Sequence, residues 1–276
     1  MRDLFEGINS VEKTTGYASM NKESFEIQES LHPKFWVVED TLHPKISKRL
    51  IEIAQDFLEG LDIEVELKDI RFTGSLAAFN WSTYSDIDLH LVVNFGDVNE
   101  DVDFVRDYFR AKIFAWNNQH NITIHGFEVE IYVENEGEPH EALGLYSIMN
   151  NEWIKKPIRE EADIDWKEVE KKANSLMDQI DRISQLLSDK KYKEVQCCAH
   201  RLKEKIKRFR RTGLDKIGTH SAENIAFKVM RRNGYLSRLA ALKTAAYDKL
   251  MSVESGGITI KLQETVKSWK NYLNGG

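Results

Sequence analysis

The sequence predicts an α+β fold, in which a short mixed sheet with covering helices is followed by an all-α helical bundle. Three short runs with the alternation of β-strands occur between residues 63 and 134. Segments with the three- and four-residue spacing of amphipathic helices separate these runs. From Trp166 onward, nearly every segment has helical spacing and none alternates like a strand. Strands and helices are therefore segregated along the chain, which is typical of an α+β protein.

The composition is that of a globular protein without a membrane segment. The chain has 276 residues, of which 41% are hydrophobic and 30% are charged, enough for one large or two modest domains. No apolar run approaches the length of a transmembrane helix, and the charged N-terminus is unlike a signal peptide. Cys197 and Cys198 are neighbours and cannot link distant segments. We therefore expect a cytoplasmic protein with no membrane partner.

Charge divides the chain into two halves. Residues 1–166 contain 15 basic and 33 acidic residues, a net charge of −18, whereas residues 167–276 contain 24 and 12, a net charge of +12. This asymmetry predicts that the second half contacts an anion. The alternative is that the two halves simply attract each other.

We expect three regions, an N-terminal arm at 1–43, a domain built on the sheet at 44–160 and a basic helical domain at 161–276. Within the arm, the segment Leu31–Trp36 combines large apolar residues with a proline. Such a cluster is expected to anchor the arm on the sheet domain, and contact with a partner or a nucleobase is the alternative.

Two helices are expected to cover the sheet. The first begins at Pro44, a favourable first helical residue, and ends at Gly60. Its apolar residues recur at spacings of three and four, which gives it one buried face. The second runs from about Asn99 to Trp116 with the same pattern.

The stretch 71–94 contains the residues with the clearest chemistry. A short strand ends at Gly74-Ser75, and a strongly apolar strand opens with Asp86-Ile87-Asp88. Alternate residues of a strand share a face, so Asp86 and Asp88 point the same way. Two adjacent carboxylates repel each other unless a cation lies between them, and a hard divalent metal suits such oxygen ligands. The Gly-Ser turn would bring backbone N–H groups close to an anion.

The pattern in this stretch resembles the signature of the DNA polymerase β-like nucleotidyltransferase superfamily. It consists of Gly-Ser, ten further residues and then Asp-Ile-Asp between apolar residues. The wider stretch, with Trp81 and Ser85, also resembles small nucleotidyltransferase-like proteins of tailed phages. The resemblance implies a nucleotidyltransferase palm in which Asp86 and Asp88 bind two Mg²⁺ (or Mn²⁺) ions together with an NTP. Gly74 and Ser75 would then hold the β- and γ-phosphates.

The resemblance also implies a third acidic ligand on a neighbouring strand. Residues 121–134 alternate around a break at Gly126, and the strand after it can lie beside the aspartates. Glu130 is our choice for the third metal ligand and third catalytic carboxylate, because apolar residues flank it; Glu128 on the same face is the alternative. His90 shares the face of Asp88, and we interpret it as a hydrogen-bonded histidine beyond reach of the metal, with a substrate contact as the alternative.

The second half is predicted to be a bundle whose helices carry a basic surface. The expected spans are 165–188, 190–211, 220–233, 235–252 and 258–273. Basic residues of the bundle are candidates to bind the nucleotide or its acceptor, among them Lys205, Arg208, Arg231 and Lys243.

These features predict a metal-dependent nucleotidyltransferase that moves a nucleoside monophosphate from an NTP to an acceptor hydroxyl and releases pyrophosphate. The basic bundle favours RNA or another nucleotide as the acceptor; a protein side chain and a small molecule remain open. The alternative is a catalytically inactive palm that acts as a nucleotide- or nucleic-acid-binding module or a host-interaction module.

Overall fold

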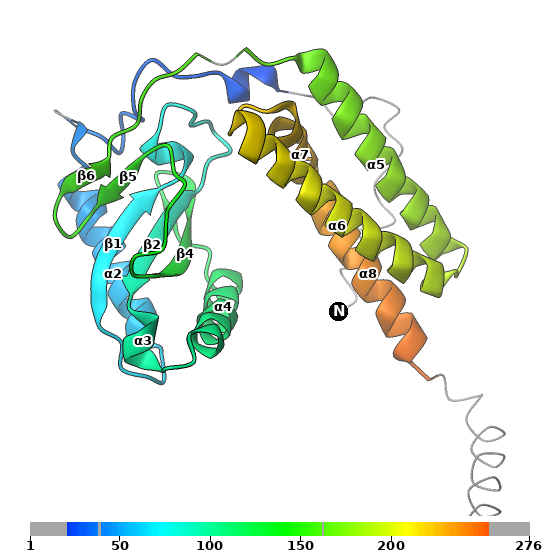
Figure 1. Ribbon diagram of the computed structural model, residues 1–276, viewed down its shortest axis with the longest axis horizontal. Helices are drawn as coiled ribbons and strands as arrows, with labels where there is room; N and C mark the ends of the chain where they lie inside the picture. The colour runs from blue at the N-terminus through cyan, green and yellow to red at the C-terminus, as the bar shows by residue number, and fades with distance from the viewer. Residues whose placement is uncertain (1–20, 38–39, 162, 254–276) are drawn as a thin grey trace, which may run out of the picture. The chain divides into compact units, whose positions relative to one another are not determined.

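A computed structural model describes residues 21–37, 40–161 and 163–253 (Figure 1). The described residues form two compact units. The first, Asn21–Ala162, contains the sheet and is called the sheet unit; the second contains the described residues from Asp163 onward and is called the helical unit. The expected α+β class is confirmed. The helix expected at 258–273, and the first 20 residues of the expected arm, lie outside the described residues.

The sheet has six strands in the order β3-β4-β2-β1-β5-β6. Strands β2 and β4 run parallel, and the other neighbouring strands are antiparallel, so the sheet is mixed as expected. In chain order the strands are β1 (Leu67–Thr73), β2 (Ile87–Val93), β3 (Thr123–Ile124), β4 (Phe127–Asn135), β5 (Leu145–Ser147) and β6 (Glu152–Lys155).

Two helices bury the apolar face of the sheet. Helix α2 (Pro44–Glu59) begins and ends where the sequence predicts, with the ring of His43 capping its first turn and Gly60 following it. Helix α4 (Val102–Gln119) begins three residues later than expected, because the Asp101 carboxylate caps it by accepting from the Phe104 N–H at 3.0 Å. A four-residue helix, α3 (Phe95–Val98), precedes α4.

The segment before α2 belongs to the core of the sheet unit. Phe35 and Trp36 are buried, and the Trp36 ring stacks on Phe72 with their centroids 5.6 Å apart. The indole N–H of Trp36 donates to the carbonyl oxygen of Leu76 at 2.7 Å. The predicted anchoring of this apolar cluster on the sheet is confirmed. A short 3₁₀ helix, η1 (Lys22–Phe25), lies earlier in the segment.

The opposite face of the sheet is polar. Alternation directs Ile87, Leu89 and Leu91 of β2 into the core, so the residues between them point to the other side. Neighbouring strands add polar side chains to the same face in matching register. The residues of this polar face are Arg71, Thr73, Asp88, His90, Glu130, Tyr132 and Glu134.

The helical unit contains four described helices. They are α5 (Trp166–Ser188), α6 (Tyr192–Ile217), α7 (Ala222–Arg232) and α8 (Tyr235–Met251). Helix α6 continues six residues beyond the predicted end at 211 and stops at Gly218, which has a φ of +87°. Ser221 caps α7 by accepting from the N–H of Asn224. None of the helices in the described part of the chain combines the length and apolar character needed to cross a lipid bilayer.

Candidate functional site

The Asp88 carboxylate lies against the backbone of Gly74. β1 ends at Thr73, which pairs with Asp88 of β2, and Gly74 follows with φ +79° and ψ −161°. This backbone conformation is available essentially to glycine alone. A Cβ placed on Gly74 would lie 1.8 Å from Asp88 Oδ2. Glycine at this position therefore lets the carboxylate lie directly beside the turn.

The parallel pairing of β2 and β4 brings Glu130 beside Asp88, because these two residues are register partners. Tyr132, two residues further along β4, donates its hydroxyl to Glu130 Oε2 at 2.5 Å and orients the carboxylate. Glu128, the alternative third acid, is exposed on the same strand. The strand on which the sequence placed the third acid is therefore a neighbour of β2.

The surroundings of Tyr132 raise the pKa of its hydroxyl. Burial is the largest cause that raises this pKa, followed by the hydrogen bond to Glu130 and the negative charges of Glu130, Asp88 and Asp86. The hydroxyl stays protonated and remains a hydrogen-bond donor.

The Gly-Ser turn leads into η3 (Ser75–Ala77), a single 3₁₀ turn rather than a longer helix. Ser75 Oγ donates to Ser85 Oγ at 2.7 Å, and Ser85 Oγ also accepts the N–H of Ser82 at 3.0 Å. These bonds tie the turn to the residue immediately before Asp86. Gly74, Ser75 and the aspartates are thus held together at one end of β1 and β2.

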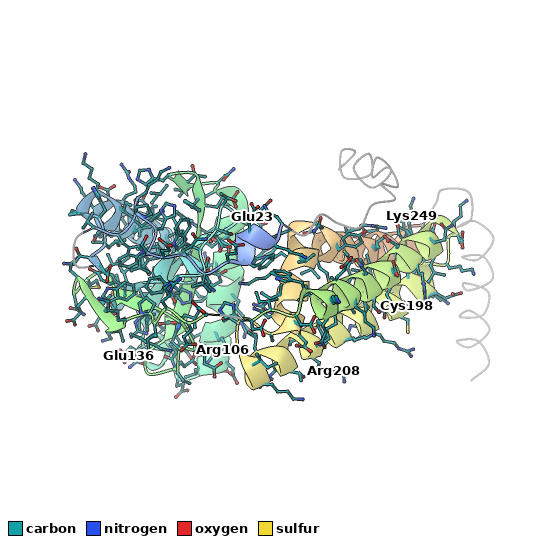
Figure 2. All side chains as sticks on the ribbon, turned by 90° about the horizontal axis from the view of Figure 1, so that it is seen from above. Glu23, Arg106, Glu136, Cys198, Arg208 and Lys249 are labelled. Atoms are coloured by element: carbon teal, nitrogen blue, oxygen red, sulfur yellow. The ribbon has the colours of Figure 1, made fainter. Side chains whose placement is uncertain are left out.

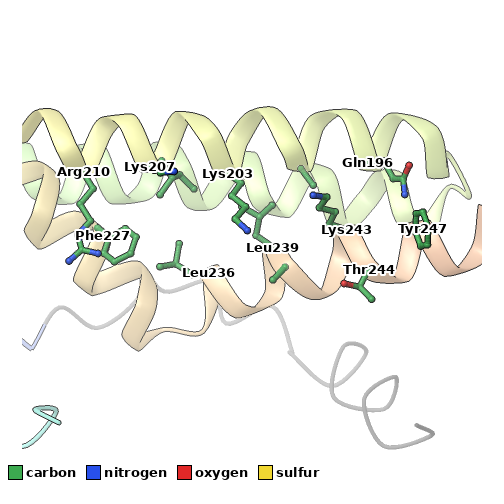
Figure 3. A pocket seen from close by; sticks show the side chains of 13 residues that line it. Gln196, Lys203, Lys207, Arg210, Phe227, Leu236, Leu239, Lys243, Thr244 and Tyr247 are labelled. Carbon is green, nitrogen blue, oxygen red and sulfur yellow. The ribbon is translucent and has the colours of Figure 1, made fainter. Parts of the chain in front are cut away.

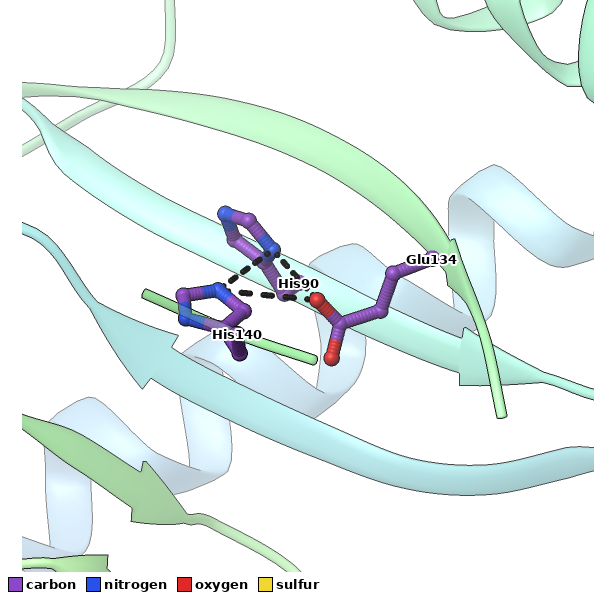
Figure 4. Close-up of side chains that lie close together, drawn as sticks. All are labelled: His90, Glu134 and His140. Carbon is purple, nitrogen blue, oxygen red and sulfur yellow. Dashed lines mark hydrogen bonds and ion pairs between the residues drawn. The ribbon is translucent and has the colours of Figure 1, made fainter. Parts of the chain in front are cut away.

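A second cluster on the polar face consists of His90, Glu134 and His140 (Figure 4). His90 Nδ1 lies 3.1 Å from Glu134 Oε2, and His140 Nε2 lies 3.5 Å from the same oxygen and 3.4 Å from His90 Nδ1. Of the described residues, this is the group of three whose candidate metal-binding atoms all lie within 4.8 Å of one another. Asp86, Asp88 and Glu130 do not form such a group. The predicted hydrogen bonding of His90 is confirmed, and its position beyond reach of the metal stays a prediction.

Partly buried ion pairs support the second cluster. Arg71 Nη1 donates to Glu134 Oε1 at 2.5 Å, and Arg71 Nε donates to Asp69 Oδ2 at 3.2 Å. Ser147 Oγ completes the chain by donating to Asp69 Oδ1 at 2.7 Å. Burial alone would raise the pKa of Glu134, but the hydrogen bond and charge of His90, with the charges of His140 and Arg71, lower it overall.

Sequence reasoning missed Arg71, Glu134 and His140 as site residues. Strand alternation could have indicated the first two, because Arg71 pairs with His90 and Glu134 shares a face with Glu130. His140 lies in the loop between β4 and β5, where no periodicity indicates which way a side chain points.

The four basic residues expected to bind nucleotide lie on different parts of the helical unit. Lys205 Nζ donates to Gln179 Oε1 of α5 at 3.0 Å. Arg208 (Figure 2) and Arg231 are exposed. Lys243 is the one of the four that lines a groove of about 630 Å³ between α6 and α8 (Figure 3). Whether any of them reaches a triphosphate stays a prediction.

Further basic residues line the same groove. Lys203, Lys207 and Arg210 of α6 follow one another at spacings of four and three, which places them on one face of the helix. Arg210 lies over the ring of Phe227, 4.3 Å from its centroid. Burial and then the charge of Arg231 lower the pKa of Arg210. The sequence could have indicated this basic row, because residues spaced by four and three lie along one face of a helix.

Comparison of the chain with protein-family models, with curated proteins and with solved structures returns no match, so the resemblance of the 71–94 stretch depends on its own residues.

Proposed function

We propose that this protein is a metal-dependent nucleotidyltransferase that transfers a nucleoside monophosphate from an NTP to an acceptor hydroxyl. The observation that carries the proposal is the position of the Asp88 carboxylate, which has the backbone of Gly74 on one side and the strand of Glu130 on the other. A carboxylate beside a glycine turn can share a cation with a phosphate bound at that turn.

Asp86, Asp88 and Glu130 are the residues that would hold Mg²⁺ or Mn²⁺. Their donor atoms are all carboxylate oxygens, the ligand type that these hard cations prefer. Bound ions would neutralise charge on the triphosphate and lower the pKa of the acceptor hydroxyl. Tyr132 contributes by fixing one Glu130 oxygen through its hydroxyl, which leaves the other oxygen available.

Gly74 and Ser75 are the residues that would bind the β- and γ-phosphates. No side chain at Gly74 separates its backbone from the Asp88 carboxylate. The Ser75 hydroxyl can reorient from Ser85 toward a phosphate oxygen, because hydroxyl donors rotate to suit their acceptors. η3 is a single turn, so these individual donors rather than a helix dipole would hold the anion.

RNA or another nucleotide is the acceptor that the helical unit supports best. Lys203, Lys207 and Lys243 line one groove with apolar residues beneath them, including Phe227 and Leu239. Clustered cations of one sign favour a polyanion over a neutral small molecule. Apolar and aromatic surface between them would accommodate bases.

The experiment offers the purified protein each NTP labelled at the α-phosphate, with Mg²⁺ or Mn²⁺ and total cellular RNA. Transfer of label to RNA or to a soluble nucleotide product supports the proposal if the Asp86→Ala/Asp88→Ala variant transfers none. Absence of label from every fraction, or equal labelling by the variant, would overturn it. NTP binding without transfer would favour the non-catalytic module.

A further inference from the structure

We propose that His90, Glu134 and His140 form a binding site for a divalent transition metal of the Zn²⁺ type. This site is separate from the carboxylates of Asp86, Asp88 and Glu130. It does not depend on the proposed nucleotidyltransferase activity.

The spacing of the three candidate ligand atoms fits tetrahedral coordination. His90 Nδ1, His140 Nε2 and Glu134 Oε2 are separated by 3.1, 3.4 and 3.5 Å. A tetrahedral Zn²⁺ with bonds of about 2.0–2.1 Å places its ligand atoms about 3.3–3.4 Å apart. The three atoms therefore need to move by only a few tenths of an ångström to share one ion.

The donor types indicate which metal the site would take. Two imidazole nitrogens and one carboxylate oxygen suit Zn²⁺ and its transition-metal neighbours, whereas Mg²⁺ and Ca²⁺ prefer oxygen ligands alone. Three protein ligands also leave a fourth position for water or substrate, as in zinc sites that are not purely structural.

The surrounding residues orient the glutamate toward the histidines. Arg71 engages Glu134 Oε1, which leaves Oε2 directed at His90 and His140. Asp69 accepts from Arg71 and offsets its positive charge beside the proposed ion. Hydrogen-bonded partners of this kind fix ligand geometry in metal sites.

The loop that carries His140 is fixed on both sides of the histidine. Glu138 Oε1 accepts from Arg106 Nη2 at 2.5 Å, and the Thr73 hydroxyl donates to the carbonyl oxygen of Gly144 at 2.9 Å. His140 Nδ1 is buried and has no hydrogen-bond partner among the described residues. The printed polar contacts of the His140 ring are those of Nε2, to Glu134 Oε2 and His90 Nδ1, where the proposed ion would bind.

The test uses the full-length chain with Cys197→Ser/Cys198→Ser, which removes both thiols as competing ligands. The protein is stripped with a chelator and titrated with Co²⁺ in excess Mg²⁺, which occupies carboxylate sites. We expect one equivalent of Co²⁺ with the visible absorption of a tetrahedral nitrogen–oxygen site, displaced by Zn²⁺. His140→Ala should weaken Co²⁺ binding by at least about 100-fold, since it removes a direct ligand.

Two controls make the result specific. His200→Ala removes an exposed histidine from α6 and should leave Co²⁺ binding unchanged. Asp86→Ala/Asp88→Ala should also retain it. Zn²⁺ should raise the thermal midpoint of the parent protein but not of His140→Ala, while the two have the same circular dichroism without metal. The proposal is overturned if the parent binds no Co²⁺, if His140→Ala binds it equally well, or if the aspartate variant loses it.

Discussion

The carboxylate of Asp88 fills the space in which a side chain at position 74 would begin. A Cβ on Gly74 would lie 1.8 Å from Oδ2 and 2.8 Å from Cγ of Asp88. Gly74 also has a positive φ of 79°, so two independent constraints require glycine there. Any larger residue would have to displace the carboxylate from the turn.

Gly74→Ala should lower metal-dependent nucleotide transfer by at least about 100-fold, because the new methyl group displaces the Asp88 carboxylate. The backbone strain of this glycine-only conformation should cost about 1–3 kcal/mol of stability. Transfer is measured with labelled NTP and stability by urea unfolding.

The matched control for this substitution is Gly137→Ala. Gly137 has the same φ of +79°, and a Cβ there would meet nothing within 4 Å. Gly137→Ala should show strain from its own positive φ but keep the transfer activity. Equal activity in the two variants would contradict the role given to the contact between Gly74 and Asp88.

Tyr132→Phe should lower transfer by about tenfold, because the Glu130 carboxylate loses the donor that orients it. Stability should fall by about 2 kcal/mol through loss of a hydrogen bond to a carboxylate. Tyr146→Phe is the control, since the buried Tyr146 hydroxyl donates to Asn151 Oδ1 at 2.9 Å and accepts from the Leu42 N–H at 3.4 Å. It should lose similar stability and no activity. A Tyr132→Phe enzyme as active as the parent would remove Tyr132 from the site.

Acid should weaken the helical unit through Glu223. This carboxylate accepts from Lys172 of α5. Burial raises its pKa, but the Lys172 hydrogen bond and charge, with a backbone hydrogen bond, bring it below the ordinary value of 4.5. The unfolded chain then binds the proton more readily than the folded one. The stabilisation is therefore complete above pH 4.5 and disappears as the pH falls through the lowered pKa.

Glu223→Gln should lower the free energy of unfolding by about 1 kcal/mol at pH 7, a modest value because the pair is partly exposed. The difference from the parent should vanish at a pH below the lowered pKa. Glu194→Gln, in the exposed first turn of α6, is the control and should have little effect at either pH. A Glu223→Gln difference that persists unchanged in acid would show that the charge is not its source.

The groove lysines should contribute phosphate contacts if RNA is the acceptor. Lys203→Ala/Lys207→Ala/Lys243→Ala should weaken binding of single-stranded RNA. It should also reduce the slope of log affinity against log salt by about 2, since each contact contributes about 0.7. Fluorescence anisotropy across a salt series measures both quantities.

The matched variant is Lys205→Ala/Arg208→Ala/Arg231→Ala, which removes the same charge outside the groove lining. Its salt slope should change less. Equal changes in the two variants would mean that RNA responds to the overall charge of the unit and not to the groove.

Local sequence patterns predicted the helices and strands more reliably than they predicted the cluster of His90, Glu134 and His140. The apolar alternation after Asp86 fixes the face of Asp88, and the same alternation in 127–135 fixes the face of Glu130. Asp88 and Glu130 are neighbours because β2 and β4 pair in parallel. That pairing depends on the topology of the whole sheet and could not be predicted from either strand alone.

Loop and edge positions could not be predicted because distant contacts determine them. His140 is placed by bonds that join Arg106 to Glu138 and Thr73 to Gly144, and neither bond leaves a periodic trace in the sequence. Strand β6 was missed because its four residues pair only at the sheet edge and are mostly exposed. In α6, Lys203 lines the groove and Lys205 bonds to α5, a difference of half a helical turn.

The most direct test measures pyrophosphate release from NTP in the presence of Mg²⁺ and acceptor by Asp88→Asn, Glu130→Gln and Glu128→Gln. Each substitution keeps the size of the side chain and removes one negative charge. We expect Asp88→Asn and Glu130→Gln to lose at least about 1,000-fold, and Glu128→Gln to retain activity near that of the parent, because Glu130 is the register partner of Asp88. Parent-like release by Asp88→Asn and Glu130→Gln would contradict the proposal that these carboxylates form the catalytic site.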